Sequence, residues 1–120
     1  MSFKELDLWE KSIELVTDIY SLTKKFPKSE IYGLTMQMRR AAVSIPSNIA
    51  EGNGRGSSKE FIQFLIVSRG SLTELMTQVE ISKRLGFIPK DESKDLLEKM
   101  ERIMMMLNKL ITTLRSKLNS

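Results

Sequence analysis

The chain has 120 residues, of which 41% are hydrophobic and 28% charged, and this composition is ordinary for a single globular domain spanning residues 1–120. It contains no cysteine and no histidine. Thiol nucleophiles, histidine bases and the usual zinc ligand sets are therefore excluded, and we expect no catalytic residue, no metal and no cofactor. The apolar runs are shorter than the about 20 residues that cross a bilayer, and no secretory signal is visible. We expect a cytoplasmic protein that is not an enzyme and has no membrane contact.

The formal net charge of +4 is unevenly distributed along the chain. Residues 1–20 have a local net charge of −3, residues 21–60 have one of +4, and every charged residue from Arg102 onward is basic. An acidic first segment with a basic middle and tail predicts an oriented field that attracts a polyanion. The alternative is that the lysines only keep a helical surface soluble.

A first helix is predicted between Leu6 and Lys25, where apolar residues recur at steps of three and four. The stripe that we assign to the core consists of Leu6, Trp9, Ile13, Val16 and Tyr20. Further apolar residues lie beside this stripe, namely Leu8, Leu15, Ile19 and Leu22. The apolar surface is therefore wider than one neighbouring helix requires. We expect the helix to end at Phe26-Pro27, because proline disfavours helical geometry in the residue before it.

A second helix is predicted after Thr35, which we expect to act as its cap. Its apolar side consists of Met38, Ala41, Ala42, Ile45 and Ile49. Pro46 lies inside this helix and has no N–H to donate to the residue four positions earlier, so we expect a kink near Ala42. Gly52, Gly54 and Gly56 follow, and they predict a flexible loop.

Two further helices are predicted from capping and turn signals. Ser57 and Glu60 have the spacing of a capping box, and Gly86 marks the end of the third helix near Leu85. The core stripe of the third helix consists of Phe61, Leu65, Ser68, Leu72, Leu75 and Val79. Pro89 and Asp91 open the fourth helix. Its core stripe consists of Leu97, Met100, Met104, Leu107, Ile111, Leu114 and Leu118.

These elements predict an all-α fold, an up-down-up-down antiparallel four-helix bundle with a kinked second helix. No segment alternates with the period of a strand. The first and fourth helices both carry apolar stripes that are broader than a monomeric bundle needs. The extra apolar width indicates a second buried surface, and hence self-association.

The second helix also carries a polar stripe. At about 100° per residue, Arg40, Ser44, Asn48 and Glu51 fall on one side of it. One interpretation is a structural polar network, in which Arg40 pairs with Glu51 or another acid, and Ser44 and Asn48 satisfy the carbonyls released at Pro46. The other interpretation is a partner site at the end of the bundle. The spacing leaves both open.

Basic residues near the second helix and its loop are candidates for contact with a nucleic acid or another partner. The candidates are Lys25, Arg39, Arg55, Lys59 and Arg69. The planar fork of arginine suits phosphate, and a loop of glycines permits close approach of the backbone. Exposed aromatic residues that stack on bases are scarce, and Tyr32 is the best candidate. We therefore predict contacts mostly to backbone phosphates, with weak sequence specificity.

The segment from Phe26 to Arg55 resembles a known bacterial family. The residues that carry the resemblance are Phe26-Pro27, Glu30-x-Tyr32-Gly33-Leu34-Thr35-x-Gln37-x-Arg39-Arg40-Ala41, Ser44-Ile45-Pro46-x-Asn48-Ile49-Ala50-Glu51-Gly52 and Gly54-Arg55, followed by Gly70-Ser71-x-x-Glu74 and Leu85-Gly86. They are similar to the four-helix-bundle proteins encoded in intervening sequences of bacterial 23S ribosomal RNA genes. The fourth helix matches only in its apolar pattern, and Ser68 stands where an alanine is expected.

The resemblance implies a four-helix bundle that assembles into a homopentameric ring. The family is also similar to the accessory variability protein of diversity-generating retroelements, a basic pentameric barrel that binds nucleic acid and a reverse transcriptase. We therefore expect a non-catalytic oligomeric scaffold that binds structured RNA or a ribonucleoprotein through the basic surface near the second helix and its loop. The alternatives are a protein-interaction adaptor with no nucleic-acid contact and, third, a small-ligand site inside the ring.

Overall fold

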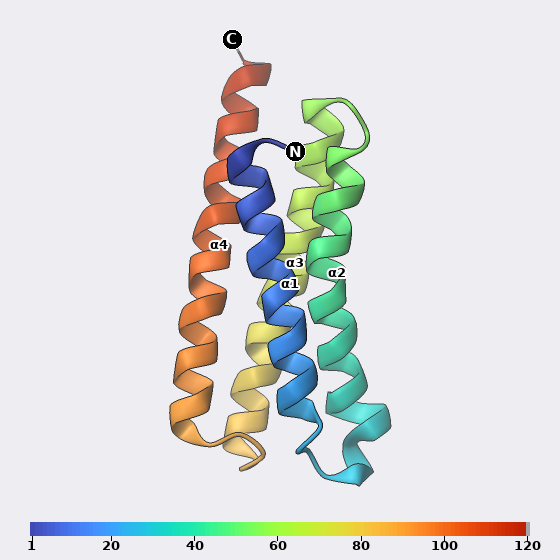
Figure 1. Cartoon of the computed structure of the whole chain (residues 1–120), viewed down its shortest axis with the longest axis vertical. Coiled ribbons are helices and arrows are strands. Elements are labelled where there is room, and N and C mark those ends of the chain that lie inside the picture. Colours follow the sequence, from blue (N-terminus) through green and yellow to red (C-terminus); the bar gives the residue numbers. More distant parts are fainter. Residues whose placement is uncertain (120) are drawn as a thin grey trace.

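The computed structural model describes residues 1–119, and it confirms the prediction of an all-α four-helix bundle. The long helices are α1 (Phe3–Thr23), α2 (Met36–Asn53), α3 (Ser58–Arg84) and α4 (Lys90–Leu118). A 3-10 turn, η1 (Lys28–Glu30), and a π-helical turn, η2 (Ile31–Thr35), connect α1 to α2. Successive long helices run in opposite directions, and the last turns of α4 extend beyond the rest of the bundle (Figure 1). Within residues 1–119, no helix has the combination of length and apolarity that a membrane span requires.

The ends of α1 are set by local signals. The helix begins at Phe3 rather than at Leu6, because Ser2 and Glu5 form a capping box that the apolar pattern did not reveal. Ser2 Oγ accepts a hydrogen bond from the Glu5 N–H, and Glu5 Oε1 accepts one from the Ser2 N–H, both at 3.2 Å. The predicted end is confirmed, since α1 stops before Pro27 and Phe26 turns into the core.

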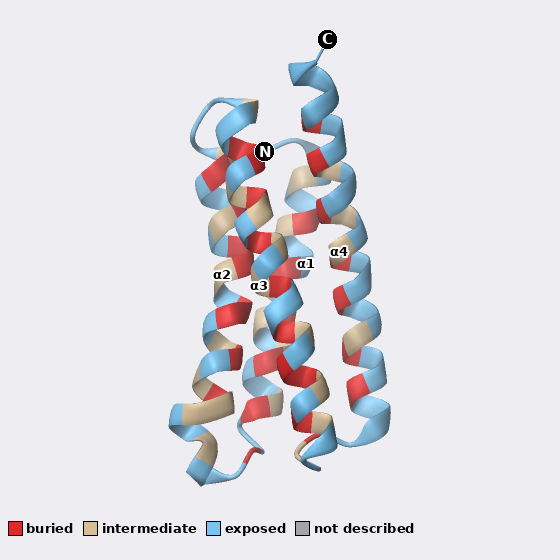
Figure 2. Cartoon of the chain, turned by 180° about the vertical axis from the view of Figure 1, so that it is seen from behind, coloured by how far each residue is buried: buried red, intermediate tan, exposed pale blue. Residues whose placement is uncertain are grey.

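The core stripes predicted for α2 and α3 are confirmed, and all of their residues are buried. The stripe predicted for α1 is wrong. Its buried side consists of Leu8, Ser12, Leu15, Ile19 and Thr23. Leu6 and Tyr20 remain 44% and 39% exposed. Figure 2 shows the buried positions turned toward the centre of the bundle.

Two hydroxyl side chains account for the wrong stripe in α1. Ser12 Oγ donates to the carbonyl of Leu8 at 2.9 Å, and Thr23 Oγ1 donates to the carbonyl of Ile19 at 2.7 Å. A hydroxyl that bonds to its own helix enters the core without leaving a polar group unsatisfied. The true core stripe therefore contains polar residues, and its apolar periodicity is interrupted.

The stripe predicted for α4 is shifted by part of a turn. Leu96 and Ile103 are buried, whereas Leu97 and Met104 are only half-buried. Leu118 is 50% exposed, because it lies on the part of α4 that extends beyond the other helices (Figure 1).

The predicted start of α2 directly after Thr35 is confirmed, but the predicted role of Thr35 as its cap is not. Thr35 is buried, and its side chain forms no capping hydrogen bond. Glu30 instead accepts a hydrogen bond from the Leu34 N–H at 3.2 Å. Helical dihedral angles are interrupted at Gly33, with φ −107° and ψ −117°, whereas α2 continues without interruption through the buried Pro46.

The two turns that flank α3 follow the sequence signals. Ser57 Oγ accepts a hydrogen bond from the Glu60 N–H at 3.2 Å, which confirms Ser57 as the cap of α3. Gly86 ends the helix with a φ of +79°, a conformation that costs glycine little. The chain then turns so that Phe87 packs against Phe26, with ring centroids 5.5 Å apart.

Candidate functional site

Ser44 and Asn48 form a polar cluster between α2 and α3. Asn48 Nδ2 donates to the carbonyl and the hydroxyl oxygen of Ser44, at 2.8 and 2.9 Å. Ser71 Oγ, from α3, donates to the same hydroxyl oxygen at 2.9 Å. One turn away, the fully buried Ser68 donates to the carbonyl of Ile45 at 3.0 Å. The cluster ties α2 to α3 beside Pro46, which is a structural role.

Arg40 and Glu51 stand apart from that cluster. Glu51 Oε1 pairs with Arg55 Nη2 at 2.7 Å, and both side chains are about half exposed. Within residues 1–119, Arg40 forms no hydrogen bond and no ion pair. The polar stripe of α2 therefore has three parts. Ser44 and Asn48 pack together, Glu51 forms a surface ion pair with Arg55, and Arg40 has no protein partner in the described chain.

The basic residues predicted to contact a partner do not share one surface. Lys25 and Arg39 lie near the end of the bundle that holds the α1–α2 connection. Arg55 and Lys59 lie at the opposite end, beside the α2–α3 loop (Figure 1). Along the axis of α2, Arg39 and Arg55 are about 24 Å apart at 1.5 Å per residue. The predicted contact residues therefore do not form one binding site.

Aromatic rings orient two of the predicted arginines. Arg39 Nε donates to Thr23 Oγ1 at 2.9 Å, and its guanidinium lies 4.5 Å from the centroid of the Tyr20 ring. The guanidinium of Arg55 lies 5.1 Å from the centroid of the Phe64 ring. Stacking on a ring leaves the edge of a guanidinium available to an anion. Both arginines are thus held in place, Arg55 with its side chain 48% exposed and Arg39 partly buried.

The remaining predicted contact residues have different surroundings. Lys59 is exposed in the first turn of α3. Arg69 donates to Asn108 Oδ1 of α4 at 3.1 Å. Lys25 lines a depression between α1 and α4 together with Asp18 and Asp95. These carboxylates make the surroundings of Lys25 less attractive to a polyanion than those of Lys59.

One end of the bundle gathers basic residues. We call it the loop end; it comprises the α2–α3 loop (residues 54–57), the first turns of α1 and α3 and the last turns of α4 (Figure 1). The basic residues on these segments are Lys4, Arg55, Lys59, Arg115 and Lys117. All charged residues of α4 from Arg102 onward are basic. Glu5 and Glu60 lie on the same segments, so five basic and two acidic residues leave an excess of three positive charges that favours an anionic partner.

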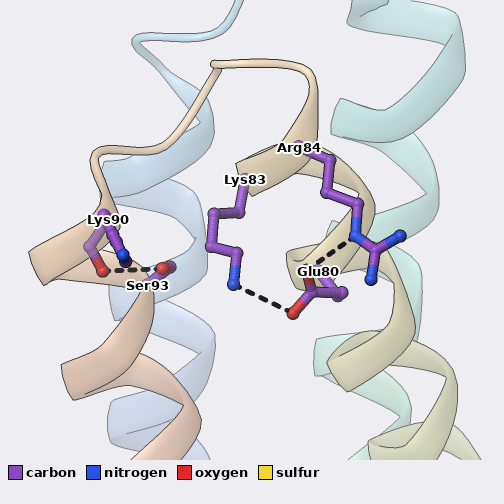
Figure 3. Close-up of polar contacts among 5 residues, drawn as sticks. All are labelled: Glu80, Lys83, Arg84, Lys90 and Ser93. Atoms are coloured by element: carbon purple, nitrogen blue, oxygen red, sulfur yellow. Dashed lines mark hydrogen bonds and ion pairs between the residues drawn. The ribbon is translucent and has the colours of Figure 1, made fainter.

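At the opposite end, two basic residues at the end of α3 share one acid, whereas Arg55 at the loop end pairs with Glu51 alone. Glu80 accepts from Arg84 at 3.0 Å and pairs with Lys83 at 3.2 Å (Figure 3). Figure 3 also shows the separate hydrogen bond from Ser93 to the carbonyl of Lys90 at the start of α4. The hydrogen bond from Arg84, and then that from Lys83, holds the pKa of the Glu80 carboxyl below its usual range. The charge of this turn is therefore partly neutralised within the chain.

A pocket that the sequence did not reveal opens between the end of α1 and the start of α2. Its volume is about 560 Å³. We call it the Tyr32 pocket; the residues that define it are Tyr20, Ile31, Tyr32, Arg39, Arg40 and Val43. Tyr32 is 83% exposed, and Arg40 is the arginine without a described protein partner. The sequence singles out four of these residues, Tyr20, Tyr32, Arg39 and Arg40, but for separate reasons.

Comparison with known proteins places the chain in a family. The family model described as the 23S rRNA-intervening sequence protein matches residues 4–109. A crystal structure of a protein of unknown function from the S23 ribosomal protein family of Bacteroides thetaiotaomicron is similar in fold, with a TM-score of 0.85. The two sequences are 22% identical over 92% of this chain and 99% of that one. No curated protein matches the chain in sequence. With nearly its whole length matched by the family model, the chain belongs to the 23S rRNA-intervening sequence protein family.

Proposed function

We propose that this protein is a non-catalytic, self-assembling scaffold of the cytoplasm that binds structured RNA, alone or within a ribonucleoprotein. The observation that carries the proposal is the basic loop end, where Arg55 and Lys59 flank a glycine loop and the basic last turns of α4 extend beyond the bundle. Clustered basic side chains gain affinity for a polyanion by releasing its counterions. The similarity of this family to a basic pentameric barrel that binds nucleic acid supports a nucleic acid as that polyanion, and we propose RNA.

Phosphate contact is the mode of binding that these residues support. Arg55 lies on the Phe64 ring and is held by Glu51, so its guanidinium is already positioned at the surface. Lys59 stands in the first turn of α3, where the backbone N–H groups add partial positive charge. We therefore expect weak dependence on RNA sequence and strong dependence on salt.

The Arg55→Ala, Lys59→Ala double variant is expected to bind a paired RNA hairpin about tenfold more weakly. Its slope of log affinity against log salt should fall by about 2, since each lost phosphate contact removes about 1. The measurement is fluorescence anisotropy with nuclease-treated protein over a series of salt concentrations.

The matched control is the Arg84→Ala, Lys90→Ala variant. It removes the same two residue types at the opposite end of the bundle, and Arg84 pairs with an acid four residues earlier, as Arg55 does. Equal loss of affinity in both variants would contradict a contact at the loop end. Absence of binding by the unmodified protein at low salt would favour the adaptor alternative, which a pull-down after nuclease treatment tests by recovering one protein partner.

The stripe predicted as the core of α1 supports self-association, and a ring of five chains is the specific form that the family resemblance implies. Leu6 is 44% exposed, and Trp9, Ile13 and Val16 beyond it are half-buried. A contiguous apolar stripe on the surface of a helix marks an interface. Phe3, 89% exposed at the start of the same helix, adds to its area.

The Leu6→Glu variant is expected to lower the molar mass in solution toward that of one chain. A carboxylate buried in an apolar interface without a partner is strongly unfavourable. The substitution should not disturb α1 itself, because a negative charge in the first turn of a helix is favourable. Light scattering at micromolar concentration measures the mass, and Val67→Glu on the exposed face of α3 is the control. A monomeric unmodified protein would contradict the assembly.

A further inference from the structure

The Tyr32 pocket combines aromatic, apolar and cationic side chains with no acid. Of the nine residues that line it in the described chain, two are arginines, two are tyrosines and none is Asp or Glu. Its volume of about 560 Å³ lies in the range of about 300–1,000 Å³ that is typical of small-ligand pockets. An anion with a flat apolar part is therefore the ligand whose chemistry matches this lining.

The aromatic and apolar part of the pocket suits a planar ring. Tyr32 is 83% exposed, so a face of its ring is open to a stacking partner. Ile31 and Val43 are 54% and 40% exposed, and both line the pocket. A flat ligand that covers these large apolar side chains removes their surface from water, and this burial favours binding.

The cationic part of the pocket suits phosphate. Arg40 lines the pocket and forms no hydrogen bond or ion pair in the described chain, so its guanidinium is available to an anion. Arg39 also lines it, held by Thr23 and by the ring of Tyr20. Glu30, the nearby acid of the connecting turns, accepts a hydrogen bond from the Leu34 N–H and is not part of the lining. Two arginines thus line one pocket, and the planar fork of each guanidinium suits a bidentate contact with phosphate.

We propose that the Tyr32 pocket binds one unpaired nucleotide of an RNA, with the base stacked on Tyr32 and the phosphate held by Arg40 and Arg39. The inference rests on the proposed RNA binding and adds to it. Phosphates of paired RNA contact the loop end, whereas an unstacked base enters the pocket, about 24 Å away along α2. Single-stranded or bulged RNA exposes the flat face that aromatic side chains recognise.

The test compares two labelled RNA hairpins by fluorescence anisotropy, one fully paired and one with a single bulged nucleotide. The unmodified protein should bind the bulged hairpin about five- to 150-fold more tightly, the range that base stacking contributes. Tyr32→Ala should abolish this preference and leave the affinity for the paired hairpin unchanged, whereas Tyr32→Phe should preserve it. Arg40→Ala should weaken binding of the bulged hairpin alone. The Arg55→Ala, Lys59→Ala variant should weaken both hairpins equally.

The outcomes separate the pocket from the loop end. Equal affinity of the unmodified protein for the two hairpins would overturn the pocket proposal and leave phosphate binding intact. Binding of neither hairpin, with calorimetric binding of adenosine monophosphate that Tyr32→Ala abolishes, would assign the pocket to free nucleotides and overturn both proposals about RNA. A change of molar mass in Tyr32→Ala, with the hairpin preference retained, would assign the pocket to contact between copies and overturn its RNA role.

Discussion

Leu107→Ala is expected to lower the free energy of unfolding by about 2–5 kcal/mol. Leu107 is fully buried in α4, where the helix packs against the other helices of the bundle. Truncation removes apolar surface from the core and leaves a cavity that rigid neighbouring helices fill only in part. Urea denaturation followed by circular dichroism at a fixed protein concentration measures the change, because assembly makes the apparent stability depend on concentration.

Met105→Ala on the same helix is the matched control. Met105 is 70% exposed on the outer face of α4, two residues from Leu107, and both alanines preserve helix propensity. We expect the control to change the free energy of unfolding by no more than about 0.5 kcal/mol. If both substitutions destabilise the protein equally, Met105 is buried in solution, and an interface on α4 would have to replace the one assigned to α1.

The fold could be predicted from the sequence because turn and capping signals are local. Ser57, Gly86 and Pro27 each act within one turn of the chain, and all three mark the observed boundaries. The capping box of Ser2 and Glu5 has the same local character, but it lies before the apolar pattern from which the start of α1 was judged. The sequence thus predicted the existence and the order of the helices, but not the start of α1.

The core face of α1 could not be predicted, because two faces of that helix are apolar. Ser12 and Thr23 lie on the buried face and look polar, whereas Trp9 and Ile13 lie on the half-exposed face and look like core. The hydroxyls bond to carbonyls of their own helix, which only the structure shows. The second apolar face of α1 also matters for function, because the stripe that the sequence predicted as core is the surface that we propose for self-association.

The candidate site was predicted residue by residue but not as an arrangement. Arg39 and Arg55 were both identified from the sequence, yet α2 places them at opposite ends of the bundle. The Tyr32 pocket joins Tyr20 of α1 to Arg40 of α2 across the turns η1 and η2. Tyr20 and Arg40 come together only because of the path that the turns η1 and η2 take around Gly33. Helical periodicity in the sequence does not predict that path.

Gly52→Ala is expected to lower the free energy of unfolding by about 1–3 kcal/mol, although alanine ordinarily stabilises a helix. Gly52 is buried in the last turn of α2, and a Cβ there would lie 2.6 Å from the Phe64 Cβ and 3.0 Å from the Phe61 ring. The Phe64 Cβ is bonded directly to the backbone of α3, so no rotamer change relieves the overlap. The two helices must therefore separate at the loop end.

Gly70→Ala in α3 is the matched control, because a Cβ at Gly70 would have no neighbour within 4 Å. It should stabilise the protein by about 0.5–1 kcal/mol, the ordinary effect of replacing a helical glycine. Separation of α2 from α3 in Gly52→Ala also moves Arg55 relative to the Phe64 ring, which now lies 5.1 Å from its guanidinium. Thermal denaturation of Gly52→Ala therefore tests the packing of α2 against α3. Hairpin anisotropy of the same variant tests whether that packing positions Arg55 for RNA. If Gly52→Ala loses stability but keeps its RNA affinity, the position of Arg55 does not depend on the close approach of the helices at Gly52. If Gly52→Ala is instead stabilised as much as Gly70→Ala, the helices do not approach this closely in solution.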